Sequence, residues 1–327
     1  MFLIWSDIPQ IRRESGLLID PTISPSPHPN RCGLFVSPLP PHAIQNPLRF
    51  EQDKACFLSE GVRCLNKYCR DPRFEFEIEQ ELLTLKDERS YLMINSAVIL
   101  AAGMGTRFGH YTDLLPKGFI PFKGKPMVVR SIETLIGCGI ERIIIGTGYH
   151  QEHYEALTKR YPQVQCVFSP RYAETNSMYT LWNCREAVGS EDFLLLESDL
   201  VYERKAIDSL LECPFDSAML ITPVTKFQDQ YYVQMNGKCE LTACSVDPEE
   251  LEPSGELVGI HKIGNAFYRL LCAEYEKVVA EQPKLGYEFQ LLDVSRRITP
   301  MHVLKVDGLQ WYEIDDARDL AYAEEHI

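Results

Sequence analysis

The sequence predicts an α/β protein in which a mostly parallel sheet is wrapped by helices. Short, uniformly apolar runs recur between residues 96 and 199, and helix-like segments separate them. Runs that are apolar on both faces are typical of parallel strands covered by helices on both sides. The chain has 327 residues, 45% of them hydrophobic, which is enough for one large domain or for one domain with an appendage.

The expected elements follow one another in order along the chain. We expect strands over residues 97–102, 141–149, 164–170 and 192–199, and helices over residues 126–139, 150–161 and 177–188. From Asp216 onward the strands become mixed, and their order is not predicted. A short strand is expected over residues 311–315 and a helix over residues 317–325.

The segment before the first strand has a different composition. Residues 21–48 are rich in proline, which removes backbone donors and interrupts periodicity, so we expect extended or disordered chain there. Residues 49–92 have helix-like apolar spacing and predict two modest helices. We therefore expect an N-terminal extension over residues 1–92 and one main domain over residues 93–327. An alternative is that Met93 is the natural start.

Charge and cysteine usage exclude several classes of protein. The formal net charge is -14 and the sequence pI is about 5.1, which argues against nucleic acid as a partner. The 11 cysteines form no C-x-x-C pair, and the N-terminus lacks the features of a secretory signal, so reduced thiols and a cytoplasmic location are expected. No apolar run approaches the ~20 residues of a membrane helix, so no membrane association is expected.

A glycine-rich loop follows the first expected strand, in "AVILAAGMGTRFG", residues 97–109. It is not the dinucleotide-binding pattern, because the glycine after Gly103 and Gly105 comes one position late, at Gly109, and the second strand ends without an acid. No Gly-Lys-Ser/Thr follows, which excludes a Walker A loop. Backbone N–H groups of such a loop can still approach phosphate. Arg107 and Lys117 flank the loop with positive charge that would offset a triphosphate.

These motifs carry a family resemblance. "LAAGMGTRF", followed by "LPKGFIPFKGKPMVVRSIE", resembles the signature of nucleotidyltransferases that make nucleoside-diphosphate adducts from NTPs. The resemblance covers residues 93–327 and implies a Rossmann-like nucleotidyltransferase fold. "PKGFIPF" resembles the branch that activates small amino-alcohol phosphates or phosphonates with CTP. "SPRYAETNSMYTLWNCREA", "LLLESDLVYE" and "WYEIDDARDL" are most similar to the 2-aminoethylphosphonate cytidylyltransferases.

The resemblance implies an activity and a set of site residues. CTP and 2-aminoethylphosphonate would give CMP-2-aminoethylphosphonate and pyrophosphate, with Arg107 and Lys117 as catalytic residues. Asn176 and Ser177 are also natural helix caps, and the resemblance favours nucleotide contact for them. The full set of expected nucleotide contacts is Leu100, Ala101, Ala102, Gly103, Met104, Gly105, Thr106, Thr147, Gly148, Asn176 and Ser177.

Two aspartates are candidate Mg²⁺ ligands. Asp199 ends an expected strand and so lies at the carboxyl edge of the sheet, where ligands bind in open α/β folds. Its alternative role is to cap a helical turn beginning at Leu200. Asp315 ends the short strand expected over residues 311–315, and its neighbour Asp316 could cap the following helix. The resemblance places the metal ligands at Asp199 and Asp315, and Mg²⁺ held by such carboxylates would neutralise the phosphates.

The acceptor's amine should be recognised by carboxylates and aromatic rings. A quaternary ammonium is held best by aromatic faces, whereas a primary ammonium also requires acceptors such as carboxylates. We expect substrate contacts from Asp229, Tyr231, Tyr287, Glu288 and His261. For each aromatic residue, and for His261, a role in the core is the alternative.

Other functions remain as alternatives. Phosphocholine as acceptor would make the chain a phosphocholine cytidylyltransferase that forms CDP-choline. A sugar-1-phosphate nucleotidyltransferase is more distant, and a nucleotide-sensing module would be expected to lack a metal acid or the lysine. The sequence leaves a homodimer open.

Overall fold

The computed structural model describes residues 94–225 and 230–327. All of these belong to one compact unit of the chain. The expected N-terminal extension, residues 1–92, lies outside the described residues, and so does the candidate substrate residue Asp229.

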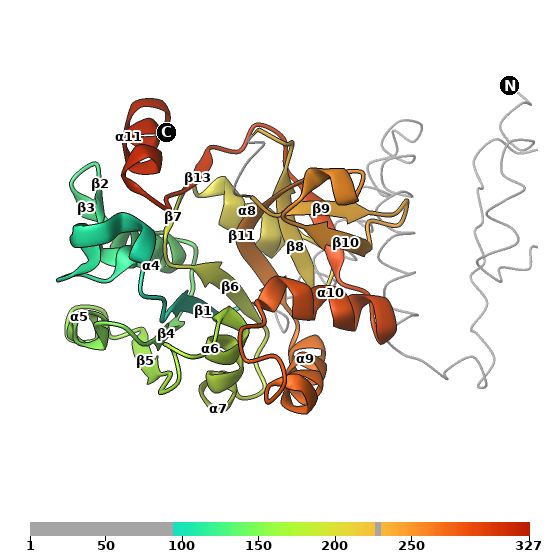
Figure 1. The fold of residues 1–327 in the computed structure, drawn as a ribbon, viewed down its shortest axis with the longest axis horizontal. Coiled ribbons are helices and arrows are strands. Elements are labelled where there is room, and N and C mark those ends of the chain that lie inside the picture. Colours follow the sequence, from blue (N-terminus) through green and yellow to red (C-terminus); the bar gives the residue numbers. More distant parts are fainter. Residues whose placement is uncertain (1–93, 226–229) are drawn as a thin grey trace, which may run out of the picture. The chain divides into compact units, whose positions relative to one another are not determined.

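The described unit is built on a nine-stranded mixed sheet (Figure 1). Strand order along the main path is β10-β9-β11-β6-β1-β4-β5, with β8 between β11 and β12. The strands are β1 (Ser96–Ala101), β4 (Arg142–Thr147), β5 (Val164–Phe168), β6 (Phe193–Glu197), β8 (Ala218–Thr222), β9 (Tyr232–Met235), β10 (Leu241–Ser245), β11 (Gly255–Ile263) and β12 (His302–Lys305). The first half is parallel, because β1 pairs in parallel with both β4 and β6. Antiparallel pairing begins where β11 joins β6, which confirms the expected change to a mixed order after Asp216.

Helices cover both faces of the sheet. The helices of the described residues are α4 (Met127–Gly137), α5 (Gln151–Leu157), α6 (Ser177–Asn183), α7 (Arg185–Val188), α8 (Lys205–Glu212), α9 (Asn265–Val278), α10 (Tyr287–Arg297) and α11 (Ala317–His326), and α11 packs on Val201 and Phe122 rather than on the sheet. All six residues of β1 are buried, and alternate side chains enter two separate cores. Ile99 packs with α4, α5 and α8, whereas Val98 packs with α6, α9 and α10. The α/β class predicted from uniformly apolar strands is confirmed.

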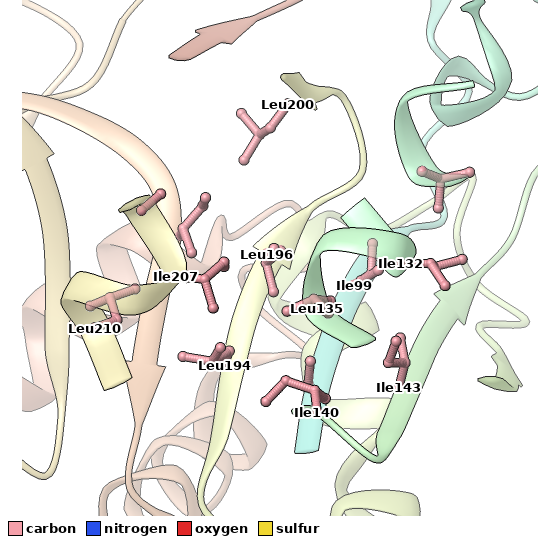
Figure 2. Packing of buried hydrophobic residues seen from close by; sticks show 14 of the residues in the cluster. Ile99, Ile132, Leu135, Ile140, Ile143, Leu194, Leu196, Leu200, Ile207 and Leu210 are labelled. Atoms are coloured by element: carbon pink, nitrogen blue, oxygen red, sulfur yellow. The ribbon is translucent and has the colours of Figure 1, made fainter. Parts of the chain in front are cut away.

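Figure 2 shows the first of these two cores from close by. Leu194 and Leu196 of β6 face Ile207 and Leu210 of α8, and Ile99 of β1 lies beside Ile132 of α4. These side chains are buried completely. Burying an aliphatic side chain of this size contributes roughly 1.5–3 kcal/mol, so this packing holds β6 and β1 rigidly in the middle of the sheet.

A separate two-stranded ribbon stands at the end of β6. It pairs β7 (Leu200–Tyr202) with β13 (Trp311–Glu313), so that Glu313 lies opposite Leu200. The Ile314 N–H extends the ladder by donating to the carbonyl oxygen of Asp199 at 3.0 Å. The residues after Asp199 are therefore a strand, and the alternative that Asp199 caps a helical turn is wrong. The ribbon holds Asp199 and Asp315 next to each other although 115 positions separate them in the sequence.

Two predicted helices have different bounds in the structure. The helix expected over residues 177–188 is divided into α6 and α7 at Cys184. The helix expected over residues 150–161 is the shorter α5, which ends at Leu157. Among the described residues, the cysteines are all free and no helix is both long and apolar enough to cross a membrane.

Candidate active site

The glycine loop bends tightly after β1. Gly105 has a φ of +61°, which an L side chain rarely adopts, and a Cβ there would come within 3.0 Å of Thr112 Cγ2 and 3.1 Å of Lys117 Cβ. The loop continues into a 3₁₀ segment, Thr106–Thr112, and a second one, Lys117–Phe119, carries the lysine. The absence of a side chain at Gly105 therefore lets the loop lie directly against Lys117.

A cavity of about 440 Å³ opens at the carboxyl ends of β1 and β6, between the glycine loop and the ribbon. Many of the predicted residues line it: Leu100, Ala102, Gly103, Gly105, Thr106, Arg107, Lys117, Asn176, Ser177, Asp199, Tyr231, Glu288 and Asp315. The structure thus brings together one continuous segment and several residues that lie far from it in the sequence. This is the edge at which open α/β sheets bind ligands.

Other predicted residues do not line the cavity. Ala101 and Thr147 are paired neighbours in the β1–β4 ladder, and both are buried. Met104 points outward and is 41% exposed. Gly148 packs against Ala102 and Tyr172, which are themselves wall residues. Tyr287 and His261 are buried behind the wall. Apart from Met104, these residues lie behind the residues that line the cavity and support them.

Lys117 links the two predicted metal ligands. Its ammonium lies 2.5 Å from Asp199 Oδ2 and also contacts Asp315 Oδ1. Burial acts to lower the pKa of Lys117, but the nearby carboxylates of Asp199, Asp315 and Glu313 outweigh it, so that the pKa is raised. Lys117 is therefore a permanent cation in the cavity. Arg107 approaches the same group, with Nη2 2.6 Å from Asp315 Oδ1, while its side chain remains 62% exposed.

The acids in this part of the cavity fit a divalent cation. Asp199 Oδ1 is buried and has no hydrogen-bond partner, although its other oxygen contacts Lys117. Carboxylate oxygens of Glu197, Asp199 and Glu313 lie within 4.8 Å of one another. Mg²⁺ is usually held by one or two carboxylates, and the buried, unpartnered Asp199 Oδ1, with Asp315 joined to Asp199 through Lys117, fits that need.

Asp315 and Asp316 are neighbours with different surroundings. Asp316 is the N-cap of α11 and forms a capping box with Asp319, accepting from the Arg318 and Asp319 N–H groups. Asp315 instead turns toward Lys117 and Arg107. The prediction that Asp316 caps the last helix is confirmed.

The inner end of the cavity is acidic. Glu288 is only 5% exposed, and its Oε2 has no hydrogen-bond partner. Burial raises the pKa of Glu288 to about 7. Burial and the neighbouring carboxylates Glu313, Asp199 and Glu288 also raise the pKa of Glu197 well above its usual range. Among the residues that the structure describes, no lysine or arginine forms an ion pair with Glu197 or Glu288.

Sequence reasoning missed Glu197 and Glu313. Both precede a predicted metal ligand by two positions, in "LLLESD" and "WYEID". Both pairs fall within strands expected from the sequence, over residues 192–199 and 311–315, and in a strand residues two apart point to the same face. The repeated E-x-D pattern was therefore the signal that could have found both. Gln230 and Tyr172 also line the cavity, and nothing in their local sequence indicates it.

Asn176 and Ser177 make local contacts as well as facing the cavity. Asn176 is the N-cap of α6, and its Oδ1 accepts from the Ser177 N–H at 2.8 Å. Ser177 Oγ accepts from the Tyr287 N–H at 3.1 Å, which ties α6 to the start of α10. Capping is thus observed for Asn176, and nucleotide contact stays a prediction for both residues.

Comparison with known proteins defines the class of this site. The family model described as "MobA-like NTP transferase domain" matches residues 97–258. The matched stretch, slightly less than half of the chain, resembles that nucleotidyltransferase family and contains the glycine loop, Lys117 and Asp199.

Two of the similar relatives are cytidylyltransferases. The 2-aminoethylphosphonate cytidylyltransferase of Lancefieldella rimae is 35% identical over 106 residues, covering 32% of this chain and 43% of that protein. The choline-phosphate cytidylyltransferase of Streptococcus pneumoniae is 38% identical over 94 residues, covering 29% of this chain and 41% of that protein. The matches thus span less than half of either relative. The chain is related to phosphonate and phosphocholine cytidylyltransferases.

A solved structure shows the same fold. The CTP:phosphocholine cytidylyltransferase from Streptococcus pneumoniae aligns with a TM-score of 0.62 and 24% identity, covering 71% of this chain and 99% of that one. This confirms the nucleotidyltransferase fold expected from the sequence.

Proposed function

We propose that the chain is a CTP-dependent cytidylyltransferase that converts 2-aminoethylphosphonate into CMP-2-aminoethylphosphonate with release of pyrophosphate. The observation that carries the proposal is the polarity of the cavity. Lys117 and Arg107 line it beside the glycine loop, and Glu197 and Glu288, which form no ion pair among the described residues, line it further from that loop. Such a cavity suits an acceptor with an anion at one end and a cation at the other.

The inner end favours a primary over a quaternary ammonium. Glu288 Oε2 is buried without a donor, and a primary ammonium carries three N–H donors that can satisfy it. A trimethylammonium has none and would require several aromatic faces. Three tyrosines line the cavity, Tyr154, Tyr172 and Tyr231, and the ring of each is already paired edge-to-face with a phenylalanine. The relationship to a 2-aminoethylphosphonate cytidylyltransferase supports the same acceptor.

The proposed reaction is a displacement at the α-phosphorus of CTP. A phosphonate oxygen forms the new P–O bond as the bond to the β-phosphate oxygen breaks and pyrophosphate leaves. The attacking oxygen is already ionised near neutral pH, so no general base is needed. Lys117 lies where it would reduce the repulsion between the two anions, and Arg107 with the N–H groups of the glycine loop would stabilise pyrophosphate.

Mg²⁺ is part of the proposal. Asp199 and Asp315 would hold it, with Asp199 Oδ1 as the oxygen that now lacks a partner. When bound, the ion supplies charge neutralisation for the phosphates.

The proposal is tested by measuring pyrophosphate release with Mg²⁺. CTP, UTP and ATP are each combined with 2-aminoethylphosphonate, phosphocholine and a sugar 1-phosphate, and the product is identified by mass. Turnover confined to CTP with 2-aminoethylphosphonate is expected. Turnover with phosphocholine instead would retain the class and overturn the acceptor. No turnover with any pair would favour the nucleotide-sensing alternative.

A further inference from the structure

We propose that Glu197 is a second carboxylate for the acceptor's ammonium group, and that Tyr287 and His261 are positioning residues that hold it in place. This inference rests on the proposed function, because it specifies how that site selects an amino-phosphonate. It assigns a role to Tyr287 and His261, which the proposed reaction does not use, and to Glu197, which lies beside the proposed Mg²⁺ ligand Asp199.

Three side chains from different elements form a buried hydrogen-bonded row. Tyr287, the first residue of α10, donates its hydroxyl proton to Glu197 Oε1 at 2.5 Å. Its oxygen must then accept from His261 Nε2, which lies 3.1 Å away on β11. Tyr287 is 1% exposed and His261 is fully buried, so neither can contact substrate directly.

The row has a definite proton arrangement. Burial lowers the pKa of His261 to about 3, so the imidazole is neutral. Its single proton belongs on Nε2, because Nδ1 has no hydrogen-bond partner and lies buried. Each hydrogen bond therefore points from His261 through Tyr287 toward Glu197. The row fixes the orientation of one carboxylate oxygen and leaves the other for a ligand.

Space for that ligand comes from a bend in β11. Gly259 has a φ of +77°, and a Cβ there would lie 3.5 Å from Glu197 Oε2. Gly259 and Glu197 both line the cavity. Within the described part of the chain, Glu197 Oε2 accepts no hydrogen bond, so it is the oxygen that faces the open cavity.

The start of α10 positions both carboxylates at once. Glu288 comes from α10 itself, and Glu197 is held through the neighbouring Tyr287. Two buried carboxylates with no cationic partner are costly unless a cation completes them. An organic ammonium has three N–H donors, so a single ammonium can bind both carboxylates at once.

The test compares two acceptors of similar size. The full chain is assayed with saturating CTP and Mg²⁺, using 2-aminoethylphosphonate and ethylphosphonate, which lacks the ammonium group. Glu197→Gln is expected to lower kcat/KM for the amino acceptor about 10- to 100-fold, as for loss of a charge-assisted hydrogen bond, and to leave ethylphosphonate nearly unchanged. Tyr287→Phe is expected to shift in the same direction by a smaller factor, mainly through the KM of the amino acceptor.

Tyr275→Phe is the matched control. Tyr275 is fully buried on α9, and its hydroxyl has no hydrogen-bond partner. Removing this hydroxyl should therefore leave kcat/KM for both acceptors unchanged. An equal loss of kcat/KM for both acceptors in Glu197→Gln, or a change only in the Mg²⁺ dependence, would overturn the inference. Glu197 would then be a Mg²⁺ ligand beside Asp199. In that case wild-type turnover of 2-aminoethylphosphonate still supports the proposed function. Failure of the wild type to turn over 2-aminoethylphosphonate would overturn both the inference and the proposed function.

Discussion

The two ends of the cavity are constructed differently. The cationic end comes from one continuous stretch, residues 100–117, in which the glycine loop and Lys117 are joined by a short connection. The acidic end is assembled from β6, β11, β13 and α10, which are distant in sequence. A local motif can specify the first end by itself. The second end exists only when the whole sheet has formed.

This difference matters for the chemistry each end would perform. The cationic end would bind phosphate, which every NTP offers, so a common loop suffices. The acidic end would distinguish one acceptor from another, and its residues are held by packing and by side-chain hydrogen bonds. We therefore expect substitutions at the two ends to have separable effects on turnover, acceptor choice and stability.

The largest expected effect is at Asp199, where the two ends meet. Asp199→Ala removes the buried carboxylate proposed to hold Mg²⁺, and we expect turnover to fall by about a thousandfold, or ~4 kcal/mol. The measurement is Mg²⁺-dependent pyrophosphate release, with thermal unfolding to show that the fold is intact. Asp307→Ala, at an exposed position, is the control. Retained activity in a folded Asp199→Ala protein would refute the metal assignment.

The next effect concerns stability at the acidic end. Glu288 has a folded-state pKa of about 7, above its ordinary value of 4.5. A raised carboxyl pKa means that the folded state binds the proton more tightly than the unfolded state. Below the unfolded pKa of 4.5 the carboxyl is protonated in both states, so burying Glu288 costs no stability. Above the folded pKa of about 7 it is ionised in both states, and the full cost of burying the charge lowers the free energy of unfolding. Glu288→Gln should be more stable than wild type by about 3 kcal/mol at pH 8, and the difference should vanish toward pH 4.5.

Urea unfolding of both proteins across this pH range measures the Glu288 effect. The wild type should lose stability relative to the variant as pH rises from about 4.5 to about 7. Parallel curves for the two proteins would show that Glu288 is not proton-linked to folding.

A smaller effect is expected at the cationic end. Arg107 contacts Asp315, but its side chain is largely exposed. A charge in this setting is screened by water, so Arg107→Ala should reduce kcat about tenfold, or ~1.4 kcal/mol, with little change in the KM of the amino acceptor. Steady-state kinetics provides the measurement, and Arg160→Ala, exposed and outside the cavity, is the control. A selective rise in the acceptor KM would mean that the two ends are not separable.

The smallest effect is expected at Asp316. Asp316→Ala removes the capping box of α11 and should lower the free energy of unfolding by about 1 kcal/mol. Turnover of the folded protein should stay within about twofold of wild type, because the Asp316 side chain turns toward the helix and not the cavity. Chemical denaturation and initial rates measure the two quantities. Loss of turnover without loss of stability would transfer the proposed metal role from Asp315 to Asp316.

The sequence was sufficient for the parallel half of the sheet and for the cationic end. Uniformly apolar strands determine how they must be covered, and the glycine loop and Lys117 are close in sequence. The structure brings Lys117 into contact with Asp199 and Asp315. This contact requires the pairing of β7 with β13, which no local sequence pattern indicates. His261 and Tyr287 were expected to touch substrate. Their sequence could not show that Glu197 lies between them and the cavity, because β6, β11 and α10 become neighbours only through tertiary packing.

The β7–β13 ribbon also determines where the chain can change length. Asp199 precedes one strand of the ribbon and Asp315 follows the other closely, so their separation depends on the pairing of Glu313 with Leu200. Deleting or adding one residue in either strand would turn its side chains to the opposite face and separate the two acids. An insertion in a loop between residues 203 and 310 leaves the pairing untouched. Relatives of this chain should therefore vary in length between the two aspartates while the ribbon itself keeps a constant number of residues.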